Sequence, residues 1–346
     1  MTEATVSGRP ELDAARLLLA QLGIAPEDLL RAGAGGPRRE VPTFAEYVPV
    51  VMAAASAGSL KAYGTYWNRV VQVWGDRRID EPRASEIEHL QAAVQASAVQ
   101  RRNGRGGRSA AEHVVSALRS LYRRAIADGY LDASQNPALK VAKPRRLPST
   151  RQALSDTRLA AINEAAACTG DDPELDCLLL RLHTETACRR AGALSLRLRD
   201  LDVDRCLILL REKGGTSRWQ PVSPTLMRYL LAHHAERGDA SPDATLLRYR
   251  NGRPLTYRRY DTLWARLGER LPWVRTQQIS MHWLRHTTLT WVERNFGHVV
   301  ARAFAGHTDG SGSPGATATY VKATLQEVAA ALAALTGEQH PVASEL

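Results

Sequence analysis

Histidine and arginine stand close together in the segment MHWLRHTTLTWVERNFG, which begins at Met281. His282 and Arg285 are three residues apart, and residues at this spacing lie on one face of a helix. Ser280 is placed to cap that helix at its start. Because a helix N-terminus attracts anions, a histidine and an arginine beside it form a suitable seat for a phosphate group. The segment therefore points to phosphate chemistry.

A metal site is the alternative use of the same segment, because His282 and His286 have the i, i+4 spacing of a metal-binding pair. A zinc-protease helix requires glutamate directly after the first histidine, and that position is Trp283 here. No set of thiolate or carboxylate ligands lies nearby in the sequence, so metal binding is the weaker interpretation. A lone histidine on a helix is most often a hydrogen-bonded core residue, and the phosphate interpretation depends on residues elsewhere.

Further candidate residues follow one another along the chain. Arg189 opens a short helix, Lys213 lies at the turn of an expected β-hairpin, and His307 follows a glycine in AFAGHTDG. Tyr320 comes thirteen residues after His307. A tyrosine hydroxyl has a pKa near ~10 and is a poor nucleophile at neutral pH, so it needs a base and an activated electrophile. Each residue taken alone has a plainer explanation, as an ion-pair partner, a solvated turn or a core aromatic ring.

Taken together, this ordered set resembles the tyrosine recombinase (phage integrase) family. The family pattern is an arginine box T-G-x-R-x-x-E-x-x-x-L-x-x-x-D, a lysine in a hairpin, H-x-x-R, L-G-H and a C-terminal tyrosine. The resemblance covers about residues 150–335 and, more loosely, the helical stretch 43–145, which looks like the family's core-binding domain. The matching positions are Thr186, Arg189, Leu196, Asp200, Lys213, His282, Arg285, Gly306, His307 and Tyr320.

The sequence departs from the family pattern at several points. Ala187 replaces the usual glycine of the arginine box, and Gly192 replaces the glutamate that supports this box in the family. Ala305 stands where the L-G-H motif has leucine. The interval between His307 and Tyr320 is longer than usual, and its additional residues lie in the stretch DGSGSPG, which suggests a mobile tyrosine segment.

The resemblance implies that three side chains bind the scissile phosphate of DNA. Arg189 and Arg285 would bind its two non-bridging oxygens and stabilise the pentacoordinate transition state, since a guanidinium is always charged and donates in a fork. His307 would donate a hydrogen bond to the same phosphate. These three residues would therefore prepare the electrophile.

Three other side chains would transfer protons and form the covalent intermediate. His282 would take the proton of Tyr320, whose oxygen attacks phosphorus to give a 3′-phosphotyrosine. Lys213 would protonate the leaving 5′-oxygen, helped by nearby arginines that lower its pKa. Because this intermediate conserves the energy of the phosphodiester, the resemblance implies no metal, no ATP and no other cofactor. The sequence contains no P-loop and no evident carboxylate triad of a nuclease.

The charge of the chain favours a polyanionic partner. The 346 residues include 46 lysines and arginines against 36 aspartates and glutamates, a formal net charge of +10. Residues 101–151 alone hold twelve basic and three acidic residues, which gives +9. An arginine-rich coding bias explains part of the total but not its concentration in one segment. We expect the following side chains to contact the backbone of duplex DNA: Arg101, Arg102, Arg105, Arg108, Lys140, Lys143, Arg145 and Arg146.

The spacing of apolar residues predicts a mainly α-helical chain with a small antiparallel β-sheet. Ser109 and Glu112 fit a capping box that opens one helix, and Gly129 fits its C-terminal stop. Gly214 and Gly215 indicate a hairpin. Other helices are expected near residues 11–23, 43–55, 59–75, 84–97, 155–168, 173–186 and 325–336.

The expected domains follow from this pattern and from the resemblance. They are an N-terminal helical segment of unknown role (1–41), a helical core DNA-binding domain with its linker (42–147), a tyrosine-recombinase catalytic domain (148–337) and a C-terminal tail (338–346). The core-binding and catalytic domains would form a clamp around duplex DNA. The linker is proline-rich and basic, over residues 136–150.

The resemblance also implies partners. Double-stranded DNA with specific recombination sites is the expected substrate, bound by a homotetramer on synapsed DNA, whereas the free protein is expected to be a monomer or dimer. An accessory directionality factor is a further candidate partner. The alanine and leucine stripe of residues 325–336 would dock on a neighbouring subunit or, alternatively, pack on its own domain.

Composition indicates where in the cell the protein acts, and two alternative functions remain open. No apolar stretch reaches the ~18 residues of a membrane span, the N-terminus lacks a signal-peptide layout, and four cysteines without a C-x-x-C pair indicate reduced thiols. We therefore expect a cytoplasmic protein. The resemblance implies in addition that it is nucleoid-associated and acts as an integrase, a resolvase or the transposase of a mobile element. The rivals are a DNA-binding regulator that has lost catalysis, and a type IB topoisomerase-like enzyme that relaxes DNA.

Overall fold

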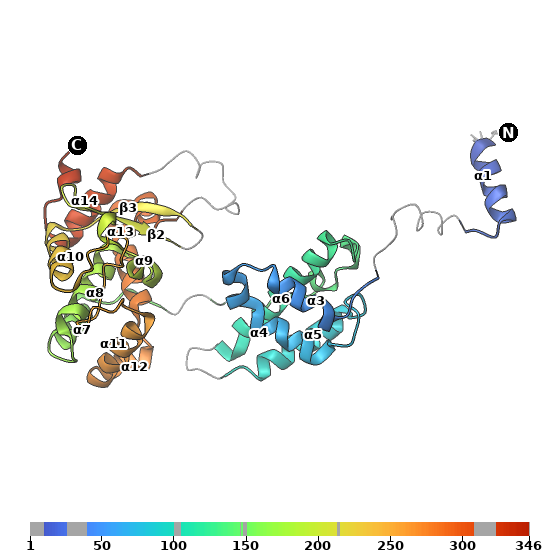
Figure 1. Cartoon of the computed structure of the whole chain (residues 1–346), viewed down its shortest axis with the longest axis horizontal. Helices are drawn as coiled ribbons and strands as arrows, with labels where there is room; N and C mark the ends of the chain where they lie inside the picture. The colour runs from blue at the N-terminus through green and yellow to red at the C-terminus, as the bar shows by residue number, and fades with distance from the viewer. Residues whose placement is uncertain are drawn as a thin grey trace, which may run out of the picture. The chain divides into compact units, whose positions relative to one another are not determined.

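The computed structural model describes residues 10–25, 40–99, 105–145, 147, 151–212, 215–307 and 323–345. The chain divides into two units, Met1–Leu147 and Pro148–Leu346, each with its own hydrophobic core (Figure 1). The side chain of Arg105 is not part of the description. The expected functional residues that lie outside the described ranges are Lys213, Tyr320, Arg101, Arg102 and Arg146.

The described part of the first unit is helical. Trp67 and Trp74, seven residues apart on one helix, are both buried in its core, and the indole nitrogen of Trp67 donates to the carbonyl of Ala117 (3.0 Å). This bond satisfies a polar group that burial would otherwise leave without a partner. The helices are α1 (Pro10–Gln21), α3 (Phe44–Ala53), α4 (Ala57–Trp74), α5 (Ala84–Ala96) and α6 (Arg108–Ala127).

Helix α6 begins two residues before the position expected from the sequence, at Arg108 rather than after Ser109. Its N-cap is Gly107 in left-handed backbone (φ +71°), and no side chain caps it. The expected capping box of Ser109 and Glu112 is therefore wrong, and the hydroxyl of Ser109 lies 3.5 Å from Nδ1 of His113 instead. A Cβ atom on Gly107 would stand 2.3 Å from the carbonyl oxygen of Gln95, so the close approach to α5 requires glycine here.

The second unit combines helices with a three-stranded antiparallel sheet of order β1-β2-β3, as the sequence predicts. Leu209 pairs with Trp219 across the hairpin. The strands are β1 (Leu201–Asp202), β2 (Leu207–Arg211) and β3 (Ser217–Pro221). The helices are α7 (Asp156–Ala167), α8 (Pro173–Thr186), α9 (Arg190–Leu194), α10 (Pro224–Arg237), α11 (Tyr257–Arg270), α12 (Pro272–Gln277), α13 (Met281–Phe304) and α14 (Leu325–Thr336).

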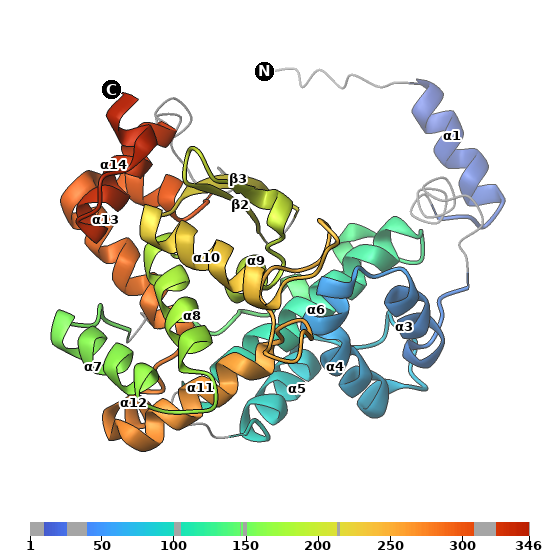
Figure 2. The same cartoon turned by 60° about the vertical axis from the view of Figure 1, so that its left-hand side comes forward.

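Helix α13 runs along α8 and carries the H-x-x-R motif in its first two turns (Figure 2). It begins after Ser280, as expected, although the Ser280 hydroxyl makes no capping bond. Near its C-terminal end, Gly297 interrupts the helix with a φ of +83°. The chain thus bends after the segment that carries His282 and Arg285.

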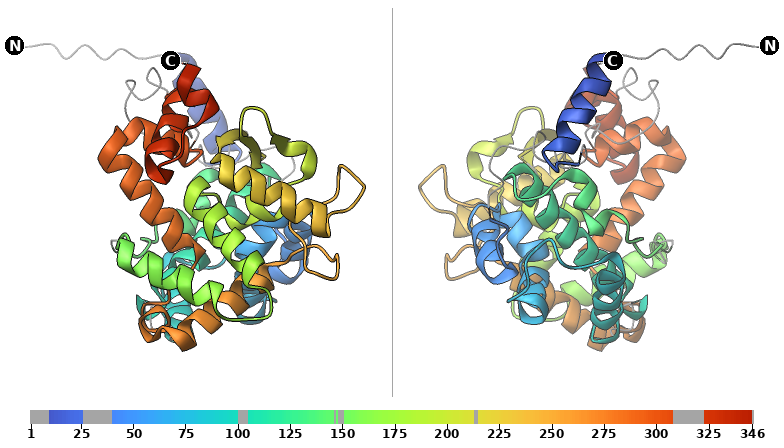
Figure 3. Two further views of the ribbon diagram at one scale, coloured as in Figure 1. Left: turned by 90° about the vertical axis from the view of Figure 1, so that its left-hand side faces the viewer. Right: turned by 90° about the vertical axis from the view of Figure 1, so that its right-hand side faces the viewer.

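Helix α14 packs on α13 of its own unit (Figure 3). The stripe residues Val328 and Leu332 are buried together with Val300 and Phe304 of α13. Of the two alternatives that the sequence leaves open, docking on a neighbouring subunit or packing on its own domain, the structure shows the stripe packed on its own domain. Within the described ranges, no helix has the length and apolarity needed to cross a membrane.

Candidate active site

Arg285 is buried at the centre of the candidate site, with only 4% of its surface exposed. One guanidinium nitrogen donates to the carbonyl of Ala187, which follows α8. The other donates to the carbonyl of Ala305, which follows α13 (2.8 Å). Burial, and then the charge of Arg189, lowers the pKa of Arg285. The guanidinium thus ties together the two turns that carry neighbouring site residues.

The turn before Arg189 has left-handed backbone. Helix α8 ends at Thr186, and Ala187 follows with a φ of +48°. Glycine adopts this conformation without strain, which explains why the family pattern has glycine here. The backbone nitrogen of Cys188 then donates to the hydroxyl of Thr186 (3.2 Å), and Arg189 becomes the N-cap of α9. The arginine box is therefore a tight turn between two helices.

A cavity of about 570 Å³ has Arg189, His282 and Arg285 on its wall. His282 is exposed, as the second residue of α13. Shielding of part of its ring from water, and then the charges of Arg151 and Arg285, lower the pKa of His282. The imidazole is therefore neutral at pH 7 and able to accept a proton.

His307 lies beside Arg285, at the turn that follows α13. Its Nε2 is 3.4 Å from Nη2 of Arg285, and partial burial together with this positive charge lowers the pKa of His307. Gly306 has a φ of +63°, and a Cβ atom there would stand 2.3 Å from Nε of Arg218. The glycine of the Gly-His step thus leaves room for a third arginine.

The sequence argument misses two charged residues of the hairpin. Glu212 is buried directly after β2, and its carboxylate accepts a hydrogen bond from Nη1 of Arg189 (2.6 Å). Arg218 on β3 donates to the side chain of Gln220 and to the carbonyl of Thr186. Burial lowers the pKa of Arg218 to about 10. The only signal in the sequence is EKGGTSR, where an acid precedes the hairpin lysine and an arginine follows it.

The described residues of the expected catalytic set come together in this one region. Arg189, His282 and Arg285 share the cavity, and His307 adjoins Arg285. Lys213 and Tyr320 lie outside the described residues. No three His, Cys, Asp or Glu side chains of the described ranges are grouped so as to hold a metal ion.

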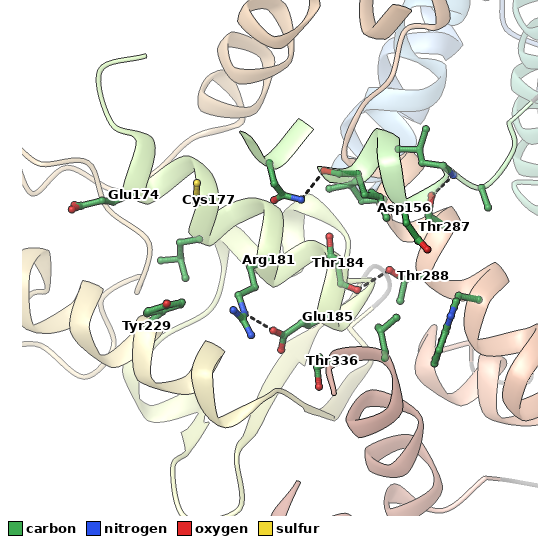
Figure 4. A pocket seen from close by; sticks show the side chains of 18 of the residues that line it. Asp156, Glu174, Cys177, Arg181, Thr184, Glu185, Tyr229, Thr287, Thr288 and Thr336 are labelled. Carbon is green, nitrogen blue, oxygen red and sulfur yellow. Dashed lines mark hydrogen bonds and ion pairs between the residues drawn. The ribbon is translucent and has the colours of Figure 1, made fainter. Parts of the chain in front are cut away.

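A larger cavity, of about 1320 Å³, lies among α7, α8, α10, α13 and α14. The expected catalytic residues that the structure describes do not line it. Figure 4 shows Arg181 pointing toward Glu185, its ion-pair partner (2.6 Å), and the hydroxyl of Thr288 donating to the carbonyl of Thr184 (2.7 Å). These polar groups are paired with one another, and the cavity does not bring together the arginines and histidine that line the smaller one.

On the first unit, the expected DNA contacts include exposed side chains. Arg119, a further basic residue of this segment, donates to the carbonyls of Ala138 (3.0 Å) and Val141 (2.8 Å). It thereby holds the chain around Lys140 against α6. The expected DNA contacts whose exposure the structure describes are Arg108, Lys140, Lys143 and Arg145.

Comparison with known proteins confirms the resemblance over most of the second unit. The model of the "Phage integrase family" matches residues 152–326, which is just over half of the chain. The chain belongs to the phage integrase family. It is a tyrosine recombinase, an enzyme that exchanges DNA strands.

Curated relatives of this recombinase carry the same activity in their names. Tyrosine recombinase XerC of Pseudomonas entomophila (strain L48) is 28% identical over 236 residues, which cover 67% of this chain and 75% of the relative. Tyrosine recombinase XerD of Rhizobium meliloti (strain 1021) is 29% identical over 207 residues, covering 56% of this chain and 65% of the relative.

Solved integrase structures share the fold of the recombinase. A lambda integrase fragment (75–356), crystallised as a dimer bound to a COC′ core site, has a TM-score of 0.59 at 15% identity. The match covers 77% of this chain and 96% of the fragment. The Tn1549 transposon integrase (82–397) in complex with circular intermediate DNA has a TM-score of 0.59 at 16% identity, over 83% of this chain and 98% of that one.

Proposed function

We propose that this recombinase cuts and rejoins duplex DNA at specific sites through a 3′-phosphotyrosine on Tyr320, without metal or ATP. The observation that carries the proposal is the cavity shared by Arg189, His282 and Arg285, with His307 beside Arg285. Groups that bind phosphate and a group that accepts a proton are thus within reach of one phosphodiester. The solved integrases of the same fold were captured with DNA, which supports duplex DNA as the substrate.

Arg189 and Arg285 are proposed to bind the non-bridging oxygens of the scissile phosphate. A guanidinium has five N–H donors. The contacts described above use one nitrogen of Arg189 and the two terminal nitrogens of Arg285, so both side chains retain N–H groups for phosphate. Because these arginines are held in place before DNA arrives, they stabilise the developing charge without a cost of reorganisation.

Proton transfer is proposed to involve His282, Tyr320 and Lys213. The lowered pKa of His282 makes it a neutral base at pH 7, which suits removal of the tyrosine proton. The Tyr320 oxygen then forms a bond to phosphorus while the bond to the 5′-oxygen breaks, and Lys213 gives its proton to that oxygen. His307 donates a hydrogen bond to the phosphate throughout. A 5′-hydroxyl of a second DNA reverses these steps and releases Tyr320.

DNA binding and assembly complete the proposal. Basic residues of the first unit, with Arg108, Lys140, Lys143 and Arg145 among them, contact the phosphate backbone, so that affinity falls steeply with salt. The two units close on duplex DNA as a clamp, and four copies assemble on two synapsed sites. One integrase of this fold was solved as a tetramer bound to a Holliday junction. An accessory directionality factor and a mobile-element role in the nucleoid belong to the same proposal.

The test is covalent trapping in EDTA. Nicked half-site duplexes tiled from the DNA flanking the gene are incubated with wild type, with Tyr320→Phe and with the matched control Tyr229→Phe, which removes an exposed hydroxyl on α10. We expect an adduct on denaturing gels with wild type and the control, and none with Tyr320→Phe. An adduct with Tyr320→Phe would overturn the nucleophile. Salt-sensitive binding without any adduct would favour the regulator, and site-independent plasmid relaxation would favour the topoisomerase.

A further inference from the structure

The carboxylate of Glu212 is buried among the arginines of the candidate site. Glu212 directly follows β2, and its side chain is only 3% exposed. One carboxylate oxygen accepts from Nη1 of Arg189 at 2.6 Å. The other lies 3.6 Å from Nη2 of Arg218 and has no hydrogen-bond partner of its own. Glu212 thus stands between two guanidinium groups that come from different elements.

The positive charges of this region repel one another. Arg285 and Arg189 each act to lower the pKa of Arg218, and Arg189 acts in the same direction on Arg285. Without a negative charge, this repulsion pushes the most exposed member outward. That member is Arg189, whose side chain is 38% exposed, compared with 14% for Arg218. Glu212 opposes the repulsion with a charge-assisted hydrogen bond, which also fixes the direction of the Arg189 fork.

The family's own support for this arginine is absent here. Gly192 is the third residue of α9 and Arg189 is its N-cap, so a glutamate at position 192 would reach back toward the backbone N–H of Arg189. In this chain a Cβ atom on Gly192 would meet the carbonyl oxygen of Arg211 at 3.4 Å. This is ordinary van der Waals contact, so the end of β2, the strand that leads into Glu212, passes directly beside position 192.

We propose that Glu212 is a positioning residue for Arg189 and supplies, from the hairpin, the carboxylate that the arginine box lacks at Gly192. The proposal rests on the proposed function of Arg189 as a ligand of the scissile phosphate.

Arg218 completes the arrangement from the other side of Glu212. Its Nε is buried without a hydrogen-bond partner, and it lies over Gly306, which precedes His307. The chain of neighbours therefore runs from Arg189 through Glu212 and Arg218 to the Gly-His turn. Loss of the Glu212 charge is therefore expected to affect both Arg189 and the turn that carries His307.

The test compares Glu212→Gln, which keeps the size of the side chain and removes its charge, with Glu269→Gln, an exposed control on α11. Single-turnover adduct formation and the Kd for the same half-site duplex are measured for both. We expect Glu212→Gln to slow adduct formation about tenfold to a hundredfold, as for loss of a charged hydrogen bond, with little change in Kd. Glu212→Asp, which keeps the charge on a shorter side chain, is expected to retain more of the rate than Glu212→Gln, whereas a merely structural role predicts that the glutamine of equal size is tolerated better.

A second measurement separates this proposal from the proposed function. Arginine side-chain NMR of the DNA-free full chain, assigned through Arg189→Lys, reports rotation of the Arg189 guanidinium. We expect a slowly rotating group in wild type and a faster one in Glu212→Gln, whether or not any DNA is cut. A freely rotating Arg189 in wild type, or an unchanged signal together with an unchanged rate in Glu212→Gln, overturns the positioning role. A restrained Arg189 without any adduct overturns only the proposed function.

Discussion

Replacement of each of the two site arginines by lysine separates structural from chemical roles. Arg285 donates to two carbonyls in different turns, those of Ala187 and Ala305. A lysine ammonium at the end of a flexible chain keeps the charge but reaches only one of them. A hydrogen bond from a charged donor contributes about 1.5–3 kcal/mol, so Arg285→Lys is expected to lower the free energy of unfolding by about that amount.

Arg189→Lys is the matched control. Arg189 makes one ion pair, to Glu212, and its side chain is 38% exposed. Because a lysine at position 189 keeps a positive charge beside the buried Glu212 carboxylate, this variant is expected to be nearly as stable as wild type. Both lysine variants are expected to form the covalent adduct at least about a hundredfold more slowly than wild type, because each loses the paired N–H groups with which a guanidinium binds phosphate.

The assay is urea denaturation of the full chain at pH 7, followed by tryptophan fluorescence, with trapping of the covalent adduct on the same preparations. The expected pattern is a loss of activity in both variants and a loss of stability in Arg285→Lys alone. Equal stability of the two variants would refute the inference that Arg285 holds the two turns together. An active Arg285→Lys would refute its role at the phosphate.

Further predictions concern other parts of the second unit. The kcat/KM for cleavage is expected to fall only as the pH drops below about 6.5, because the pKa of His282 lies below its ordinary value and protonation removes the base. His282→Gln is expected to abolish this pH dependence. Gly306→Ala is expected to cost about 1–2 kcal/mol in urea denaturation, because its backbone is left-handed and Arg218 occupies the space, with adduct formation slowed as well. Asp176→Ala is expected to cost about 3–5 kcal/mol in the same assay, because it leaves two arginines of α11 without their buried carboxylate.

Local signals in the sequence predict much of the fold. Helix α8 has the predicted bounds because Pro173 suits a first helical position and Asp172 caps the backbone of Leu175. Helix α14 also has its predicted bounds, and a capping box of Thr324 and Glu327 fixes its start. The start of α6 is missed because the contact that decides it, between Gly107 and the end of α5, joins residues that no local pattern connects.

In the candidate site too, residues that local spacing identifies are predicted from the sequence, whereas residues that depend on tertiary contacts are missed. His282 and Arg285 are found from their spacing on a helix, and the structure places both on one cavity. Glu212 is missed because its function depends on Arg189, a residue 23 positions away that the hairpin and α9 bring to 2.6 Å. The choice between the two packings of the C-terminal stripe likewise needs the partner surface of α13, which no periodicity describes.

The departures from the family pattern differ in what they require of the rest of the chain. Ala187 and Ala305 contact Arg285 through backbone carbonyls, which every residue supplies, so a change of side chain preserves both bonds. Ala187 costs only the strain of a left-handed alanine, about 1 kcal/mol. Loss of the glutamate at Gly192 is different, because that residue acts through its side chain and the backbone offers no substitute. A compensating carboxylate is therefore needed only for Gly192, and Glu212 is the residue that the hairpin places against Arg189.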